Sequence, residues 1–362
     1  MLLSPDQEMI RDAVRDFAQR ELWPYAAKWD KDHHFPHEAH QGLAALGAYG
    51  ICVPEALGGA GLDYLTLALV LEEIAAGDGG TSTAISVTNC PVNAILMRYG
   101  NAAQQQRWLG PLARGEMLGA FCLTEPHVGS DASALRTTAT REGDAYVLNG
   151  VKQFITSGKN GQVAIVIAVT DKGAGKKGMS AFIVPTDTPG WVVARLEDKL
   201  GQHSSDTAQI LLEQCRIPAE NLIGQEGEGY KIALSALEGG RIGIAAQSVG
   251  MARSALDVAI QYAKERQSFG RAIIDHQAVG FRLAEGATVR LRIPVHFNGQ
   301  DASPGLKKGG VLNPWGYSRE VLKQPLLKKI CQNEDLSNKA VQIFQSIMKY
   351  MGDYPSKKVR CS

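Results

Sequence analysis

The spacing of apolar residues changes twice along the chain, and this order constrains the fold more than any other feature. Up to residue 117, apolar residues recur every three or four positions, as in MIRDAVRDFAQREL and LTLALVLEEIAA, which is typical of amphipathic helices. From about Phe121 the period is two, in strand-like segments such as VAIVIAVT and MSAFIVPT. Helical spacing returns at about Tyr230. The order of helices, strands and helices predicts an α+β fold built from successive domains.

The middle region has strands with no helical segment between them, so we expect an antiparallel sheet that closes into a small β-barrel. The dipeptide Asn149-Gly150 separates two alternating runs and predicts a tight hairpin turn. The segment GAGKKG (173–178) matches the glycine pattern of dinucleotide-binding loops, but a strand follows it where such a site needs a helix. We therefore predict a hairpin loop there.

Composition excludes several classes of protein. Of the 362 residues, 44% are hydrophobic and 21% charged, which is ordinary for a globular protein, and no apolar run approaches the ~20 residues of a membrane span. The N-terminus reads as a charged helix without a signal or transit peptide, so we expect a cytoplasmic protein. The six cysteines show no metal-binding spacing, and we predict no metal site and no nucleic-acid partner.

The charge balance divides the chain near Gly286, where the helical pattern of QAVGFRLAE also stops. Residues 286–362 carry a net charge of +8 and the remainder −7, which together give the chain its net charge of +1. We predict four regions: a helical domain (1–118), a β domain (119–230), the start of a helical bundle (231–285) and a divergent basic tail (286–362).

Two polar clusters in the β region could line a planar cofactor. FCLTEPHVGSDAS (121–133) supplies hydroxyl groups and a glycine that lets a ligand approach the backbone, and KQFITSG (152–158) supplies an aromatic ring beside Thr156 and Ser157. On composition alone, turns and strand ends are the favoured explanation of both clusters.

Six ordered blocks resemble the acyl-CoA dehydrogenases, flavoenzymes that introduce an α,β double bond into acyl-CoA thioesters. They are VPEALGGAGLDYL, FCLTEPHVGSDAS, LNGVKQFITSG, IPAENLIGQEGEGY, LEGGRIGIAAQSVGMARSALDVAIQYAKERQSFG and HQAVGFRLAE, within residues 4 to about 285. The resemblance implies a helical domain, a β-barrel and a four-helix bundle, FAD as cofactor, and a homotetramer (a dimer of dimers) if the bundle is complete. It also implies a short- or branched-short-chain acyl-CoA substrate, with electrons passed to electron-transfer flavoprotein.

The resemblance assigns roles to matching positions. The residues implied to line FAD are Phe121, Leu123, Thr124, Gly129, Ser130, Phe154, Ile155 and Thr156. Those implied to reach the FAD of a neighbouring subunit are Arg266, Phe269 and Gln277. Those implied to touch acyl-CoA are Ser130, Glu238 and Arg241.

The catalytic base is unassigned. This family holds a glutamate either in a late YEGT segment or in the helix that begins GGRIGIA. Here Gly240 occupies the second position, and no YEGT follows residue 286. Glu238 lies about 200° around the helix from residue 240, so we expect it to point away from that site. We therefore expect this chain to have little or no activity.

Residues 319–358 resemble the start of a myosin-tail homology module. Residues 286–318 resemble neither family and read as a linker or a shifted reading frame, and a chimeric coding sequence would explain both observations. Two alternatives to the dehydrogenase stay open. One is an acyl-CoA oxidase or nitroalkane-oxidase-like flavoenzyme, and the other is a non-catalytic interaction protein that acts through the basic tail.

Overall fold

The computed structural model describes residues 3–283, apart from the side chain of Arg282. Within this range, residues 9–247 form one compact unit, and residues 3–8 and 248–283 belong to a second. The basic tail predicted for residues 286–362 and the myosin-tail resemblance over 319–358 lie outside the described residues.

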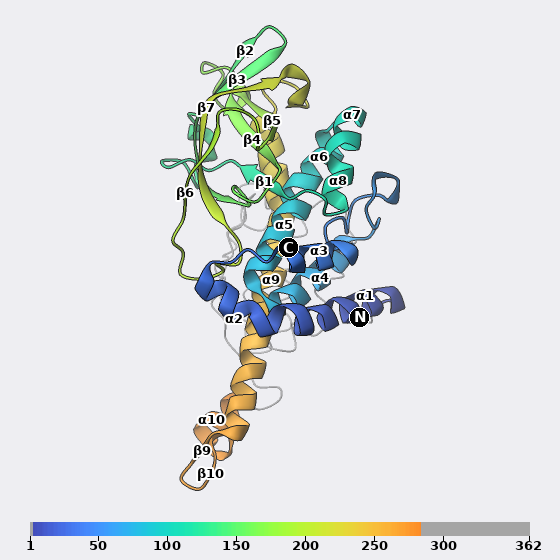
Figure 1. Ribbon diagram of the computed structural model, residues 1–362, viewed down its shortest axis with the longest axis vertical. Coiled ribbons are helices and arrows are strands. Elements are labelled where there is room, and N and C mark those ends of the chain that lie inside the picture. Colours follow the sequence, from blue (N-terminus) through green and yellow to red (C-terminus); the bar gives the residue numbers. More distant parts are fainter. Residues whose placement is uncertain (1–2, 284–362) are drawn as a thin grey trace, which may run out of the picture. The chain divides into compact units, whose positions relative to one another are not determined.

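The first part of the chain is helical, as its three- and four-residue spacing predicts (Figure 1). The helices are α1 (Pro5–Phe17), α2 (Trp23–Asp32), α3 (His37–Ala45), α4 (Tyr64–Gly77), α5 (Gly79–Val87), α6 (Ala94–Tyr99), α7 (Ala102–Gln104) and α8 (Gly110–Ala113). Asp63 and Asp78 cap the first turns of α4 and α5, where each carboxylate accepts a hydrogen bond from a backbone N–H three residues later. Apolar residues surround α4 on nearly every side, and this helix is accordingly buried.

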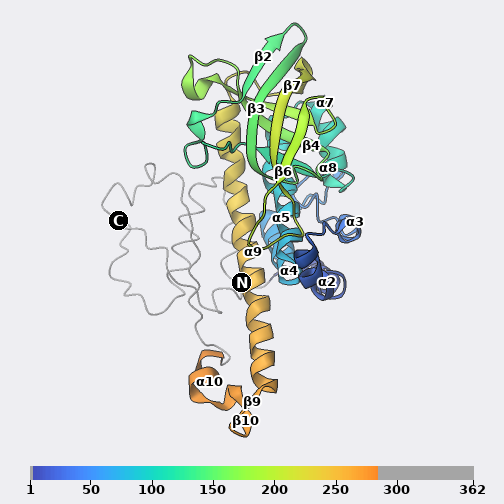
Figure 2. The same ribbon diagram turned by 60° about the vertical axis from the view of Figure 1, so that its left-hand side comes forward.

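The middle of the chain forms an eight-stranded sheet. Its strands are β1 (Gly119–Cys122), β2 (Thr138–Glu142), β3 (Ala145–Thr156), β4 (Val163–Val169), β5 (Met179–Pro185), β6 (Trp191–Leu196), β7 (Thr207–Pro218) and β8 (Leu222–Ile223). They pair in the order β6-β7-β3-β2-β4-β5-β8, and β1 also pairs with β4. Figure 2 labels β2, β3, β4, β6 and β7 of this sheet. The barrel closure expected from the sequence stays a prediction.

Most pairings are antiparallel, as predicted, but β1 and β2 each run parallel to β4. The prediction of a wholly antiparallel sheet was therefore wrong. A parallel pair needs a crossover of a dozen or more residues, which is usually a helix. Between β1 and β4 that crossover is supplied by the β2–β3 hairpin.

The hairpin turn predicted at Asn149-Gly150 was also wrong, because both residues lie inside β3. The β2–β3 turn is Gly143-Asp144, six residues earlier, with Gly143 at a φ of 65°. The Asn149 side chain instead accepts the backbone N–H of Gln214 at 2.8 Å, where β7 bulges. A Cβ at Gly150 would lie 2.5 Å from Thr137 Oγ1, so close packing explains this glycine.

The segment GAGKKG joins β4 to β5 through a short 3-10 turn at Gly175–Gly178, which confirms the predicted hairpin loop. The strand β5 begins at the next residue.

Strand β4 is buried on both faces, which explains its unbroken apolar run. Val163, Ile165 and Ile167 face a core shared with the N-terminal helices and the start of α9 (Gly229–Glu265). Ala164, Val166 and Ala168 face a second core enclosed by β3, β5 and β7, which also holds Cys122 at the end of β1. The sheet therefore has a dry interior on either side of its centre.

The second unit contains the later part of α9, the two-stranded hairpin of β9 (Gln267–Ser268) and β10 (Arg271–Ala272), and α10 (Gln277–Leu283). The rest of the predicted bundle lies outside the described residues. No described helix is long and apolar enough to cross a membrane.

Candidate active site

The two segments assigned to the flavin meet where β1 and β3 end. The backbone N–H of Gln153 donates to the carbonyl oxygen of Thr124 at 2.9 Å, so the loop that carries Thr124 is joined to β3 one residue before Phe154. Thr124 and Thr156 are half-buried. Two segments about 30 positions apart in the sequence are thus brought together, and we call Thr124, Phe154 and Thr156 the flavin wall.

Phe154 is held in an unusual conformation on this wall. Its φ is 58°, and the register of β3 against β7 shifts between Lys152 and Ile155, so Phe154 sits at a β-bulge. Its side chain is 61% exposed, whereas Ile155 is buried in the sheet core. An exposed aromatic side chain in a strained backbone position, fixed by a buried neighbour, is typical of a ligand-facing residue.

A buried ion pair lies directly behind the wall. The ammonium of Lys152 is fully buried and donates to Glu125 Oε1 at 3.0 Å and to the carbonyl oxygen of Leu123 at 3.1 Å. Glu125 also accepts the backbone N–H groups of Arg136 and Thr137, at 2.8 and 2.9 Å. The pair therefore ties β3 to the loop that follows β1.

The pKa values of the pair follow from these contacts. Burial lowers the pKa of Lys152, and the Glu125 carboxylate opposes this effect. Burial alone would raise the pKa of Glu125, but the charge of Lys152 and the hydrogen bonds from Thr137 and Arg136 outweigh it and hold that pKa below its usual range. The glutamate is thus stabilised as a carboxylate.

The loop after β1 presents its later residues to solvent. Leu123 packs in the core, so the backbone is the part of this residue available to a ligand. Glu125 and Val128 form a bridge that closes a tight turn, after which Gly129 and Ser130 are exposed. A Cβ added at Gly129 would meet no atom within 4 Å, so the open side of the loop lies there. Phe121, by contrast, is half-buried against the core.

The helix α9 carries the residues assigned to acyl-CoA. Glu238 and Arg241 are half-buried, and burial lowers the pKa of Arg241, with Glu238 opposing the shift. Gly239 and Gly243 pack against the N-terminal helices, near Tyr64 and near Ser86. A Cβ added at Gly240 would meet nothing within 4 Å, so a side chain at position 240 has open space before it.

The three residues assigned to a neighbouring subunit's cofactor are all exposed and all belong to the second unit. Phe269 and Gly270 form the two-residue turn between β9 and β10, with φ values of 52° and 75°, as a type I′ turn requires. The Phe269 side chain is 98% exposed. Arg266 precedes this hairpin and Gln277 begins α10.

Sequence reasoning missed Lys152, Glu125 and Gln153 as parts of the site. The lysine within the predicted strand NGVKQFI was the available signal, because a strand interior rarely holds an unpaired ammonium. Its partner could not be found from spacing, since Glu125 lies 27 residues away.

A helical domain, a sheet and a further helix follow one another along the described residues, in the order that the sequence resemblance implies. The family models for the acyl-CoA dehydrogenase N-terminal, middle and C-terminal domains match residues 4–116, 120–215 and 227–291. The short-chain specific acyl-CoA dehydrogenase of Rattus norvegicus mitochondria is 45% identical over 285 residues, which are 79% of this chain and 69% of that protein.

Solved structures agree with the sequence matches. The electron transferring flavoprotein structure of Acidaminococcus fermentans has a TM-score of 0.82 at 36% identity, covering 99% of this chain and 92% of that one. A glutaryl-CoA dehydrogenase from Mycobacterium smegmatis in complex with FADH2 has a TM-score of 0.73 at 34% identity, covering 78% of this chain and 71% of that one. The chain belongs to the acyl-CoA dehydrogenase family.

Proposed function

We propose that residues 4–285 bind FAD and are built for α,β-dehydrogenation of a short- or branched-short-chain acyl-CoA, with electrons passed to electron-transfer flavoprotein, but that this chain has little or no activity because it lacks the catalytic base. The observation that carries this proposal is the joined wall of Thr124 and Phe154, in which an exposed ring stands beside half-buried hydroxyl groups. The short-chain relative supports the substrate class, and the FADH2 complex and the flavoprotein neighbour support the cofactor and the acceptor.

The residues of the wall fit a planar flavin. The Phe154 ring can stack on the isoalloxazine, and the backbone and hydroxyl of Thr124 can face its polar pyrimidine edge. Ser130, exposed beside Gly129, can reach the pyrophosphate without steric hindrance. A bound FAD would supply the hydride acceptor. Arg266, Phe269 and Gln277 would meet the cofactor of a neighbouring subunit in a homotetramer.

Substrate activation requires two actions of the protein. Hydrogen bonds must polarise the thioester carbonyl, and a carboxylate must take the α-proton while the β-hydrogen leaves as hydride. The half-buried Arg241 and Glu238 would hold the acyl-CoA. Glu238 is about 200° around α9 from position 240, so it does not replace a base there.

The base is the missing part of the proposal. Gly240 has no side chain, and the open space before it would admit a glutamate. We therefore expect this chain to bind FAD, and we expect substrate to reduce the bound flavin very slowly. The segment in which a late glutamate would fall lies outside the described residues.

The test is the visible spectrum of the purified full chain before and after anaerobic addition of butyryl-CoA. We expect an oxidised flavin band that persists in the native chain and bleaches in Gly240→Glu. Ala245→Glu, which adds the same charge at an exposed position of the same helix, is the matched control and should stay oxidised. Absence of any flavin would contradict the binding proposal, and rapid bleaching of the native chain would contradict the assignment of the base.

Admission of air to the reduced Gly240→Glu variant separates the dehydrogenase from the oxidase alternative. Reoxidation within the mixing time would favour an oxidase, and slow reoxidation that electron-transfer flavoprotein accelerates would favour the dehydrogenase.

A further inference from the structure

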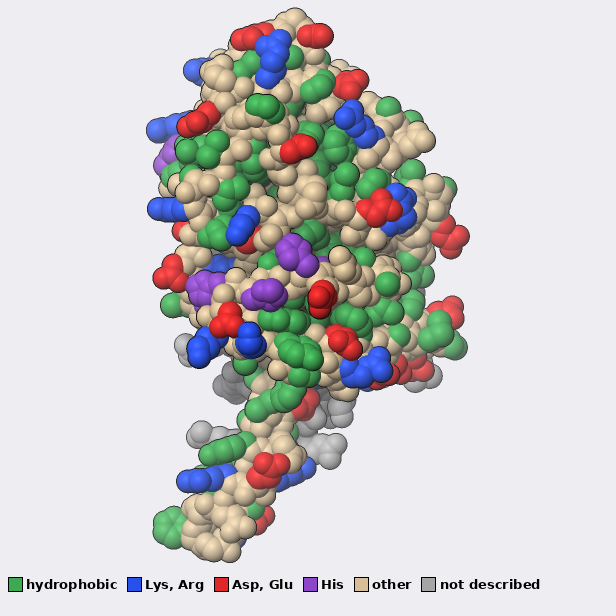
Figure 3. Space-filling view, viewed as in Figure 1, with side chains coloured by type: hydrophobic (Ala, Val, Ile, Leu, Met, Phe, Trp, Pro, Cys, Tyr) green, Lys and Arg blue, Asp and Glu red, His purple; other side chains and the backbone are tan. Residues whose placement is uncertain are grey.

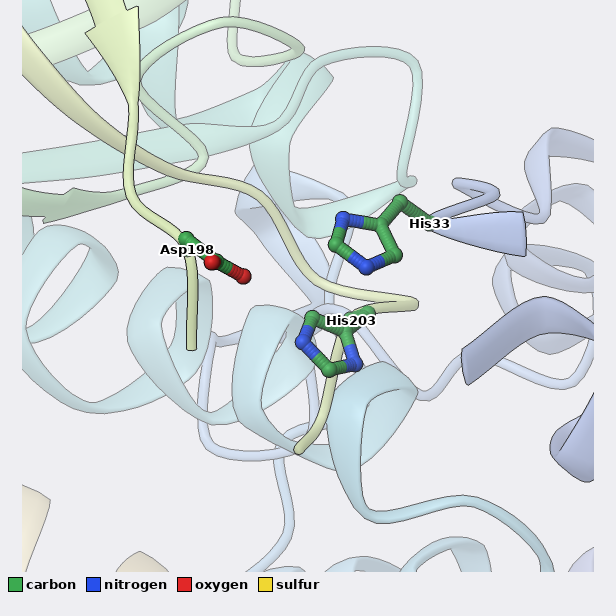
Figure 4. Close-up of side chains that lie close together, drawn as sticks. All are labelled: His33, Asp198 and His203. Carbon is green, nitrogen blue, oxygen red and sulfur yellow. The ribbon is translucent and has the colours of Figure 1, made fainter. Parts of the chain in front are cut away.

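Histidine side chains gather on the face of the larger unit shown in Figure 3. His33 at the end of α2 and His203 in the loop between β6 and β7 stack with ring centroids 4.0 Å apart and planes 13° from parallel. The Asp198 carboxylate extends toward these rings from the same loop as His203 (Figure 4). One ligand atom from each of the three side chains lies within 4.8 Å of the other two.

The two ring nitrogens of His203 have different neighbours. Its Nε2 lies 2.6 Å from the carbonyl oxygen of Lys199, which can only accept, so Nε2 carries the proton. Its Nδ1 is buried and faces the Asp30 carboxylate, with Asp30 Oδ1 3.0 Å away. Two acceptors that face each other at this distance need a proton or a cation near them.

His203 shares one feature with metal ligands: at metal centres a ligating imidazole commonly donates its second N–H to a carbonyl or carboxylate. A backbone carbonyl fixes the orientation of His203, whose side chain is only 12% exposed. His33 and Asp198 are exposed. Because imidazole lone pairs lie in the ring planes, the His33 ring has to turn out of its parallel stack on His203 before both rings can direct a nitrogen at one ion.

The surrounding structure holds the cluster in place. The backbone N–H of His203 donates to Asp30 Oδ1 at 2.9 Å, which joins the loop to α2. The next residue, Ser204, donates to the buried Asp78 carboxylate at 2.6 Å. His33 caps the C-terminus of α2 with a φ of 51°, and that end of a helix favours a cation. Lys199 is turned into carbonyl groups of its own loop, so its ammonium is engaged elsewhere.

We propose that His33, Asp198 and His203 bind a divalent transition-metal ion of the zinc class, with the Asp30 carboxylate beside them. Two imidazoles and a carboxylate suit Zn²⁺, Co²⁺ and Ni²⁺ better than Mg²⁺ or Ca²⁺, which prefer oxygen ligands alone. Ligand bonds of about 2.0–2.2 Å require the three atoms to draw somewhat closer than 4.8 Å. The exposed side chains of His33 and Asp198 can supply that movement.

A bound ion would connect the end of α2 to the loop between β6 and β7. Because the two segments are about 170 residues apart, the unfolded chain would not preserve the site, and binding would stabilise the folded form. The proposal concerns residues outside the flavin wall and does not depend on the proposed activity.

The test is titration of the metal-free full chain with Co²⁺, followed by the ligand-field absorption of the bound ion, and with Zn²⁺, followed by the thermal unfolding midpoint. We expect a saturable one-to-one band and a midpoint that rises with Zn²⁺. His33→Ala and Asp198→Asn should each weaken binding by about 10-fold or more. Both positions are exposed, so both variants should fold.

His34→Ala and His37→Ala are the matched controls, since both histidines are exposed and neither belongs to the cluster. They should bind the metal as the native chain does. Equal affinity in His33→Ala and the native chain would overturn the proposal, as would no saturable band. A midpoint that shifts with pH but not with metal would show that a proton alone lies between His203 and Asp30, and would also overturn it.

Discussion

Replacement of Lys152 by methionine tests whether the buried ion pair holds the flavin wall together. Methionine keeps most of the volume of the side chain but removes both donated hydrogen bonds, to Glu125 and to the Leu123 carbonyl. The Glu125 carboxylate, 3% exposed, would stay buried with its two backbone N–H donors and no counter-charge. Removal of one partner from a buried pair costs about 3–5 kcal/mol. Because Glu125 keeps its two backbone N–H donors, we expect the free energy of unfolding to fall by about 3 kcal/mol, near the lower end of that range.

Urea unfolding of the native chain and of Lys152→Met measures this loss, and titration with FAD measures the effect on the wall. Lys159→Met, which removes an exposed ammonium just beyond the same strand, is the control and should change the free energy of unfolding by less than about 0.5 kcal/mol.

The double variant Lys152→Met with Glu125→Gln sharpens the test, because it removes both charges. We expect it to recover about 1–3 kcal/mol relative to the sum of the two single changes. FAD affinity should remain weakened in the double variant even where stability recovers, since the link to the Leu123 carbonyl is still absent. Additive effects on unfolding, or unchanged FAD affinity in Lys152→Met, would refute the reasoning.

Four further outcomes follow from the described structure. Gly240→Glu should bleach the flavin with butyryl-CoA, because a side chain there enters open space, and anaerobic spectroscopy checks it. Phe154→Ala should weaken FAD binding by about 2- to 10-fold, as loss of one aromatic contact implies, while the urea midpoint stays nearly constant because the ring is exposed. Gly150→Ala should destabilise the fold by about 1–3 kcal/mol in urea, since the added Cβ meets Thr137 at 2.5 Å. Burial lowers the pKa of His40 to about 3, so below about pH 6.5 the unfolded chain binds a proton at this residue that the folded protein does not bind. The free energy of unfolding should therefore fall as the pH is lowered from about 6.5 to 3, by up to about 1.4 kcal/mol per pH unit. His40→Gln should reduce that pH dependence in urea unfolding.

The order of elements could be predicted from the sequence because each period is a local property. Helices need apolar residues every three or four positions and strands need alternation, and both patterns stand in the chain itself. Pairing between strands is not local. The parallel contact of β1 with β4 depends on a hairpin that crosses between them, and no residue in either strand encodes that direction.

The misplaced turn at Asn149-Gly150 has the same cause. The dipeptide suits a type I′ turn, but its roles here come from distant partners: Asn149 holds the bulge at Gln214, and Gly150 makes room for Thr137. In the candidate site, the resemblance located Thr124 and Phe154, whereas the Lys152–Glu125 pair emerged only when the two segments were brought together. The cluster of His33 and His203 was hidden by a separation of 170 residues.

The burial of Cys122 gives the flavin wall a chemical reporter of its own. This thiol ends β1, immediately before the loop that carries Thr124, and burial raises its pKa to about 12. A thiol-specific reagent reacts with the thiolate and can reach it only when the strand opens. The rate at which the peptide containing Cys122 gains label, followed by mass spectrometry in native buffer, therefore counts opening events of that strand. Bound FAD should slow this rate by the same factor by which it stabilises the closed wall.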